Sequence, residues 1–407
     1  MSVQKAFKFR LYPKAEQREW LARQFGCCRV VYNHFLAERI AFYAAHKGEK
    51  KQGLTFNDTC KALTQLKRQA DYAWLNEVNA QALQQTLHNL DAAYVNFFAG
   101  RAAFPKFKRK SDKQSFRVPQ GFAVEAETGH LHLPKMTPLR IVIHRPVEGA
   151  LRSVTVSRTP SGRYFASILC EVDIPVPAAK HPVREQGLDL GLKTFAVTSD
   201  GEQIVTPAFL RRAEHQLIRA QRRLSRKKPG SHNRDKARVR LARLHEKVAN
   251  QRADFLHKQS HRLTRENQAL YVEDLQVKGL LANHHLAKGI SDAGWGEFLR
   301  QLQYKGAWYG CRVEAVGVFF PSSKQCHVCG HIKADLTLAD REWDCPVCAT
   351  HHDRDFNAAR NLLLEGQARH NLIDSCRAGT ARTQTPGETC ARKAGRRTRK
   401  PAALAVG

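Results

Sequence analysis

The sequence has no long hydrophobic run, and acidic residues are scarce compared with basic ones. No apolar stretch reaches about 18 residues, so no membrane-spanning helix is predicted. The N-terminal segment MSVQKAFKFRLYP mixes basic and aromatic residues and lacks the apolar core of a secretion signal. We therefore expect a cytoplasmic protein.

The scarcity of acidic residues leaves a large positive charge. The 67 Lys and Arg residues face 37 Asp and Glu residues, which gives a formal net charge of +30. Such an excess of one sign raises self-repulsion in the folded state and is typical of proteins that bind a polyanion. Solubility alone requires no bias toward one sign. Nucleic acid is the predicted partner, and an anionic membrane is the less favoured alternative.

The N-terminal part of the chain predicts strands combined with helices. Hydrophobic residues make up 42% of the 407 residues, enough for packed cores in two or three domains. Alternation over residues 5–12 predicts a strand, and apolar spacing over 14–99 predicts a mainly helical module. Residues 151–175 predict a hairpin. We expect a β-barrel, interrupted by the helical module and formed by residues 1–13 and 100–178.

The C-terminal part predicts a second unit, so that the fold class is α+β and multidomain. Prolines between residues 175 and 182 mark the boundary. Residues 366–407 contain many Gly, Thr and Arg residues without an apolar period, and we expect them to form a disordered basic tail. The expected elements are strands in 187–201, a helical hairpin in 211–265, a strand at 269–275, a helix at 293–308, a strand at 311–318 and a helix from Asp355.

Four of the 11 cysteines have the spacing of a zinc site. Two Cys-x2-Cys turns follow each other and can direct four thiolates to one tetrahedral zinc ion. The residues are Cys326, Cys329, Cys345 and Cys348. A redox pair is the less favoured alternative, because that motif needs only one Cys-x2-Cys. Four sulfur ligands leave no open position, so the zinc ion is predicted to be structural. We expect the other seven cysteines to be core or incidental residues.

Acidic residues at the ends of predicted strands and helices suggest a second kind of metal site. Asp189 lies in an apolar strand between two glycines, where a charge is costly unless a cation compensates it. Glu273 or Asp274 ends the next acidic strand, and alternation allows only one of them to join Asp189. Asp355 or Asp353 opens the last helix, and either suits an N-cap. Carboxylates converging in this way would hold two Mg or Mn ions, the chemistry of phosphodiester cleavage.

The histidines beside these last two aspartates leave a further alternative open. His351 and His352 are adjacent and could themselves be metal ligands, although we favour this less than the carboxylate site.

With these features the chain resembles TnpB, the RNA-guided DNA endonuclease of bacterial insertion sequences and a relative of type V CRISPR effector nucleases. The segments that carry the resemblance cover about residues 1–365, in the order KFRLYPKAEQREWLARQFGCCRVVYN, FPKFKRK, GLDLGLKTFAV, SDAGWGEFLRQLQYKGAWYG and FPSSKQCHVCG…WDCPVCATHHDRDFNAARN. The resemblance implies a RuvC-like nuclease with an RNase H fold, whose catalytic acids are Asp189, Glu273 and Asp355. It selects Glu273 over Asp274 and Asp355 over Asp353.

The same resemblance implies a division into domains. Residues 183–320 and 351–365 would form the nuclease, and 321–350 a zinc-binding insert for target nucleic acid. The β-barrel would be a wedge domain, and the helical module a recognition lobe. A noncoding RNA would guide cleavage of double-stranded DNA beside a short target-adjacent motif, and we expect a monomeric ribonucleoprotein associated with the bacterial nucleoid.

Several residues are candidates for nucleic-acid contacts in this picture. Aromatic rings among basic residues could stack on bases while the cations meet phosphates, although a solvated linker is an equally good interpretation. These residues are Phe104, Lys106, Phe107, Lys108, Arg109 and Lys110, with Phe116 nearby. The basic hairpin in 211–265 is predicted to face a heteroduplex. Gln84, between Gln81 and Gln85, could read an adenine edge.

Two other functions are compatible with the sequence. A transposase would use the same metals with a 3′-hydroxyl nucleophile in place of water. A zinc-dependent DNA-binding regulator would need no catalytic acids, and the intact set disfavours it.

Overall fold

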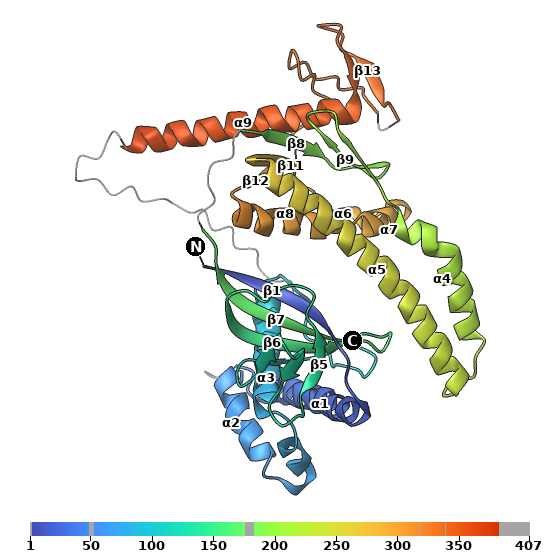
Figure 1. Ribbon diagram of the computed structural model, residues 1–407. Coiled ribbons are helices and arrows are strands. Elements are labelled where there is room, and N and C mark those ends of the chain that lie inside the picture. Colours follow the sequence, from blue (N-terminus) through green and yellow to red (C-terminus); the bar gives the residue numbers. More distant parts are fainter. Residues whose placement is uncertain (1, 49–52, 176–182, 318, 338, 382–407) are drawn as a thin grey trace.

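Two β-sheets organise the chain, and helices pack against each of them (Figure 1). The computed structural model describes residues 2–48, 53–175, 183–317, 319–337 and 339–381. None of the helices in these ranges is long and apolar enough to cross a membrane.

The N-terminal sheet is antiparallel and has seven strands. Strand β1 (Ser2–Leu11) pairs along its whole length with β7 (Tyr164–Asp173), which also pairs with β6 (Ala150–Arg158). The predicted first strand and the predicted hairpin are therefore confirmed. The sheet order is β2-β6-β7-β1-β5-β4-β3, in which the remaining strands are β2 (Gln114–Val118), β3 (Ala123–Glu125), β4 (His130–His132) and β5 (Leu139–Val142).

The predicted closed β-barrel is wrong for the described residues, because β2 and β3 end the sheet at opposite edges and the sheet is curled but open. Helices, not further strands, complete its core. Phe116 of β2 packs against Trp20 and Phe25 with ring centroids 6.3 and 5.4 Å apart. Both partners lie on the helix α1 (Ala15–Ala45).

The predicted helical module is confirmed as α1, α2 (Phe56–Leu66), the 3-10 helix η1 (Ala70–Asn76) and α3 (Ala80–Phe98). Thr55 and Asp58 cap α2 reciprocally, and the Asn79 side chain accepts a hydrogen bond from the first turn of α3. The buried faces of these helices and the inner face of the sheet form one continuous hydrophobic core. The module and the sheet are therefore one packed unit.

The second sheet has five strands in the order β10-β9-β8-β11-β12. Its central strands β8 (Glu185–Asp189) and β11 (Ala269–Glu273) are parallel, and β11 is also parallel to β12 (Arg312–Val316). The strands β9 (Thr194–Thr198) and β10 (Gln203–Val205) extend the sheet in antiparallel pairing. Because parallel strands end at the same edge, the carboxyl ends of β8 and β11 lie together.

Helices cover both faces of this sheet. On one face lies α5 (His232–Glu266), which forms the predicted basic hairpin with α4 (Phe209–Ser225) and contacts α8 (Trp295–Tyr309). The short helices α6 (Val277–Leu280) and α7 (His284–Ala293) precede α8. The other face is covered by α9 (Arg354–Ala381), the long orange helix in Figure 1. Between β12 and α9 lies the cysteine-containing insert with the small hairpin of β13 (Glu342–Asp344) and β14 (His351–Asp353).

The predicted disorder from residue 366 onward is wrong for residues 366–381, which continue α9. Polar and close-packed contacts replace the apolar period that the sequence lacks. Gln367 donates to Glu185 at 2.8 Å, and the backbone at Gly366 lies against the ring of Tyr271. The remaining part of the predicted tail, residues 382–407, lies outside the described residues.

Candidate functional site

Strand alternation brings two acidic side chains to the face of the sheet that α9 covers, and α9 itself carries a third. On β11, Leu270 and Val272 belong to the core beneath α5 and α8, whereas Ala269 and Tyr271 pack with α9. Glu273 therefore points to the α9 face. On β8, Leu188 faces the α5 core.

Gly187 and Asp189 alternate with Leu188 and so face α9. A Cβ at Gly187 would collide with the carbonyl oxygen of Ala359, which shows how closely the backbone of α9 approaches β8. Asp355 lies in the first turn of α9. All three acids predicted from the resemblance therefore occupy one side of the sheet.

These carboxylates interact electrostatically. Burial, followed by the negative charges of Asp355 and Glu273, raises the pKa of Asp189 to about 7, although the Arg354 cation opposes the shift. Burial also raises the pKa of Glu273. Like charges held together in a partly buried site favour protonation or the binding of a cation. The donor set of oxygen atoms suits Mg or Mn.

The two rival acids have other roles. The Asp353 carboxylate accepts a hydrogen bond from the Phe356 N–H at 2.8 Å, so Asp353 caps α9. Asp274 is exposed beyond the end of β11, and its N–H donates to the Val316 carbonyl at 3.1 Å. By strand alternation Asp274 faces away from Glu273, whereas the Asp353 charge is near enough to contribute to the raised pKa of Asp189.

Two arginines that the sequence reasoning missed flank Asp355. Arg341 from the insert and Arg354 at the start of α9 each place a guanidinium nitrogen 3.5 Å from its carboxylate. Arg354 was visible only as the middle residue of Asp353-Arg354-Asp355, and nothing local marks Arg341. Together they add positive charge beside a cluster of negative groups.

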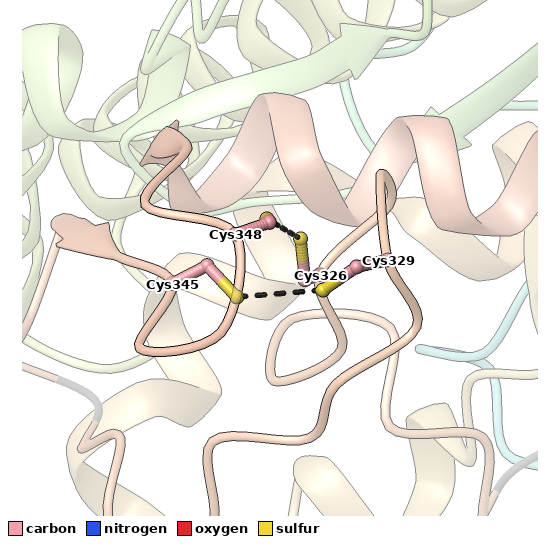
Figure 2. Close-up of side chains that lie close together, drawn as sticks. All are labelled: Cys326, Cys329, Cys345 and Cys348. Atoms are coloured by element: carbon pink, nitrogen blue, oxygen red, sulfur yellow. Dashed lines mark hydrogen bonds between the residues drawn. The ribbon is translucent and has the colours of Figure 1, made fainter.

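The four cysteines form a tighter cluster than the acids. Among the described residues, they are the one group of three or more His, Cys, Asp or Glu ligand atoms that all lie within 4.8 Å of one another. The sulfur atoms of Cys326 and Cys348 are 3.6 Å apart, and those of Cys329 and Cys345 are 3.5 Å apart (Figure 2). A tetrahedral site with Zn–S bonds of about 2.3 Å requires sulfur separations of roughly 3.8 Å. The cluster therefore fits one zinc ion.

Both Cys-x2-Cys turns have the same backbone geometry. The N–H of Gly330 donates to the Cys326 carbonyl, and the N–H of Ala349 donates to the Cys345 carbonyl, both at 2.9 Å. Each of these two donor residues has a positive φ, +78° for Gly330 and +56° for Ala349. In the sequence, Gly330 after the first Cys-x2-Cys pair indicates such a turn. The second turn reaches the same conformation with an alanine.

The two adjacent histidines lie beside the cysteine cluster without completing it. His352 is buried, and its Nε2 lies 3.1 Å from the Cys326 sulfur. His351 is exposed and lies 2.8 Å from an Asp344 oxygen. The cysteines that were not predicted to bind metal include Cys27, Cys28, Cys170 and Cys311, all of which are buried.

The candidate nucleic-acid residues fall into two groups. Phe104 and Phe107 are 43% and 53% exposed, and Phe104 lines a cavity of about 760 Å³ beside Tyr94. The exposed group also includes Lys106, Arg109, Lys110 and, on α3, Gln84. Phe116, by contrast, is buried in the core and cannot stack on a base. The Lys108 ammonium lies 3.8 Å from the centre of the Tyr32 ring.

The α4–α5 hairpin carries a strongly basic surface. One hollow along α4 is lined by Arg219, Arg222, Arg223 and Arg226. A second hollow is lined by Arg240, Arg243 and Lys247 of α5 together with Arg163, which comes from the turn of the β6–β7 hairpin. The N-terminal sheet thus adds a cation to this surface.

Three family models match parts of the chain. A model described as "Probable transposase" matches residues 167–284, and one described as "Cas12f1-like, TNB domain" matches residues 295–362. A third, described as "Helix-turn-helix domain", matches residues 1–48. In the structure this last segment is strand β1 followed by the single 31-residue helix α1.

Similar proteins cover nearly the whole chain. A Streptomyces pristinaespiralis protein named "Putative RNA-guided DNA endonuclease" is 44% identical over 92% of both chains. The Escherichia coli K12 protein of the same description, InsQ, is 34% identical over 94% of this chain and 97% of its own. A mimivirus "TnpB-like protein" is 28% identical over 88% of this chain and 72% of its own.

Solved structures add a likeness in fold. The protein in a cryo-EM structure of a Cas12f1–sgRNA–target DNA complex has a TM-score of 0.57 and 14% identity, covering 89% of this chain and 98% of that one. The identity of the full-length relatives, together with the matched segments, establishes the assignment: the chain belongs to the TnpB family of insertion-sequence proteins.

Proposed function

We propose that this protein is an RNA-guided endonuclease that hydrolyses DNA phosphodiesters beside a short target-adjacent motif. The observation that carries the proposal is the meeting of Asp189, Glu273 and Asp355 on one face of the five-stranded sheet, with the pKa of Asp189 raised by its neighbours. The names of the full-length relatives support the same activity.

The three acids would hold two Mg or Mn ions. Bound ions of this kind activate water and stabilise the charge on the leaving oxygen. Asp189, at the centre of the cluster, would give up its proton when cations bind, because they remove the repulsion that raises its pKa. Arg341 and Arg354 orient Asp355 from two sides.

The arrangement of the sheet supports a RuvC-like nuclease of RNase H type. Three strands in antiparallel order continue into two parallel strands, and helices cover both faces. The nuclease would comprise residues 183–320 and 351–365, and α9 extends it beyond that range. The zinc-binding insert at 321–350 would be a structural element that contacts target nucleic acid.

The basic surfaces support binding of a guide RNA and double-stranded target DNA. Arginines along α4 and α5 would face the phosphates of a guide–target heteroduplex, whose sequence is read by base pairing. Phe104 and Phe107 would stack on unpaired bases, and Gln84 would read the target-adjacent motif. In this proposal the curled sheet is the wedge domain and α1–α3 are the recognition lobe.

The function is tested by purifying the protein with its bound RNA, sequencing that RNA and supplying a plasmid that carries the matching target. We expect cut plasmid with Mg or Mn and no cutting by Asp189→Ala, which should still bind the RNA. Joined DNA products would instead indicate strand transfer by a transposase. Binding without cutting would indicate a regulator, and the absence of a defined RNA would refute the guided mechanism.

A further inference from the structure

Helix α9 lies between the two metal sites and contacts both. Its first turn carries Asp355, and Ala359 packs against β8 beside Asp189. Two asparagines one turn apart, Asn357 and Asn361, are 0% and 1% exposed. Residues four apart lie on the same side of a helix, so this pair forms one polar strip. The strip faces the zinc-binding insert.

The amide of Asn357 binds both sequence neighbours of the zinc ligand Cys326. Its Oδ1 accepts a hydrogen bond from the His327 N–H at 3.1 Å and lies 3.0 Å from His327 Nδ1. Its Nδ2 donates to the Gln325 carbonyl at 2.7 Å. Asn361 Nδ2 donates to the Ser322 carbonyl at 2.8 Å, a few residues before the turn. The first Cys-x2-Cys turn is therefore attached to the helix by side-chain amides.

The two asparagines are buried, the turn that they hold is partly buried, and each group in the attachment has a partner. An asparagine offers both a donor and an acceptor, and here both satisfy backbone groups of the turn. Loss of the Asn357 amide would leave the partly buried His327 N–H without this acceptor, whereas the Gln325 carbonyl would keep the hydrogen bond that Asn361 Nδ2 donates at 2.5 Å. Such contacts fix the position of the helix relative to the turn more firmly than the 3.5 Å contact between Arg341 and Asp355 does.

We propose that Asn357 is a positioning residue that transmits the order of the zinc site to Asp355. Zinc fixes the turn around Cys326, the turn holds Asn357, and Asn357 fixes the first turn of α9 two residues from Asp355. Loss of the ion would release this turn, and Asp355 would lose its position beside Asp189. The inference rests on the proposed nuclease function, because it concerns the same three acids.

The test compares Asn357→Ala with a control on the same helix, Gln367→Ala, whose side chain contacts Glu185 and not the insert. Three quantities are measured on the protein–RNA complex: zinc content by mass spectrometry, Mn²⁺ affinity by calorimetry without DNA, and the single-turnover rate of cleavage. Asn357→Ala should retain one zinc ion, while Mn²⁺ affinity and cleavage rate each fall by about 10- to 100-fold, as for groups that orient metal ligands. Gln367→Ala should stay within about twofold of the parent.

A second variant, which keeps part of the hydrogen bonding, distinguishes a loss of positioning from a general loss of folding. Asn357→Asp keeps the acceptor for the His327 N–H and loses the donation to the Gln325 carbonyl. It should lie between Asn357→Ala and the parent in Mn²⁺ affinity. Parent-like Mn²⁺ affinity and cleavage in both variants would overturn the proposal.

A double variant shows whether loss of a zinc ligand and loss of the Asn357 amide act through the same route or independently. Cys329→Ser removes a zinc ligand, and Cys329→Ser/Asn357→Ala should be no more than about twofold slower than Cys329→Ser alone, because the zinc signal passes through Asn357. Multiplicative losses would overturn the proposal. If the parent complex fails to cut DNA while Asn357→Ala still weakens Mn²⁺ binding, the proposed function fails and the positioning role stands.

Discussion

The two predicted metal sites are built in opposite ways. The four cysteines come from two short turns between residues 326 and 348, and their sulfur atoms lie close to the separation that a zinc ion requires. The three acids come from two strands and a helix between residues 189 and 355, and they meet only when the whole sheet is assembled. The zinc site follows from local turn geometry, whereas the acid site follows from packing at longer range.

Removal of zinc should have the largest effect, and it should affect the cysteine-containing insert without affecting the N-terminal sheet. Structural zinc contributes roughly 10–16 kcal/mol of apparent binding free energy in small domains. Chelation should therefore abolish hydrogen-exchange protection in residues 321–353 while leaving β6 and β7 protected. Hydrogen exchange with mass spectrometry measures both regions at once. The control variant is Cys60→Ser, which replaces a half-buried cysteine outside the cluster and should leave protection in both regions unchanged. Loss of protection in β6 and β7 after chelation would contradict the local origin of the zinc site.

The acid site should make the metal-free protein sensitive to pH. The pKa of Asp189 is raised to about 7 from its ordinary value of 3.8, so the folded state holds a proton that the unfolded state has released. Stability should therefore fall as pH rises from about 4 to about 7 and level off above that, by on the order of 2–4 kcal/mol. Thermal melting across pH measures this decline. Asp189→Asn and added Mg²⁺ should each remove it, and an unchanged decline in Asp189→Asn would assign it to another group.

The packing of α9 on β8 should tolerate no added methyl group. Gly187→Ala would drive its Cβ into the Ala359 carbonyl and push the helix outward. We expect destabilisation of about 1–3 kcal/mol, with loss of cleavage and full retention of zinc. Gly279→Ala, with open space around its Cα, is the control. Parent-like cleavage by Gly187→Ala would show that the acid site does not require this close approach.

The smallest effect concerns the two turns of the zinc site. Ala349 adopts the left-handed conformation that Gly330 adopts without strain. Ala349→Gly should therefore strengthen zinc retention by about 1 kcal/mol, and Gly330→Ala should weaken it by a similar amount. The rate of zinc release to a chromogenic chelator measures both. Equal effects of the same sign would show that the turns are not equivalent.

The sequence predicted features that depend on local spacing. The cysteine spacing predicted the cluster that the four sulfur atoms form. Strand alternation and turn residues predicted β1, the β6–β7 hairpin and the break between α4 and α5. Strand alternation alone left Glu273 and Asp274 as alternatives; the resemblance selected Glu273, and the face of the sheet that α9 covers agrees with that choice. The N-cap pattern likewise left Asp353 and Asp355 as alternatives; the resemblance selected Asp355, and the structure shows that Asp353 caps the helix.

Features that depend on residues distant in the chain could not be predicted from the sequence. Phe116 lies among basic residues like Phe107, yet helix α1 covers one ring and not the other. Where α9 continues past residue 365, Gln367 contacts Glu185 of β8 and Gly366 lies against the Tyr271 ring of β11, contacts that an apolar period does not signal. Asn357 lies in a segment that carries the resemblance, but its contacts could not be predicted from it, because they are made with the carbonyl and N–H groups of a turn some 30 residues away.

The position of α9 also sets the order of events during synthesis. The ribosome makes Asp189 long before Asp355, and the helix that covers β8 is the last described element to emerge. At about 5–20 residues per second, Asp189 waits roughly 10–30 s for Asp355, and Glu273 waits roughly half as long. A nascent chain therefore has no complete set of acids while the basic helices are already exposed to nucleic acid. In the proposed nuclease, the basic helices α4 and α5 are therefore made before the set of acids is complete.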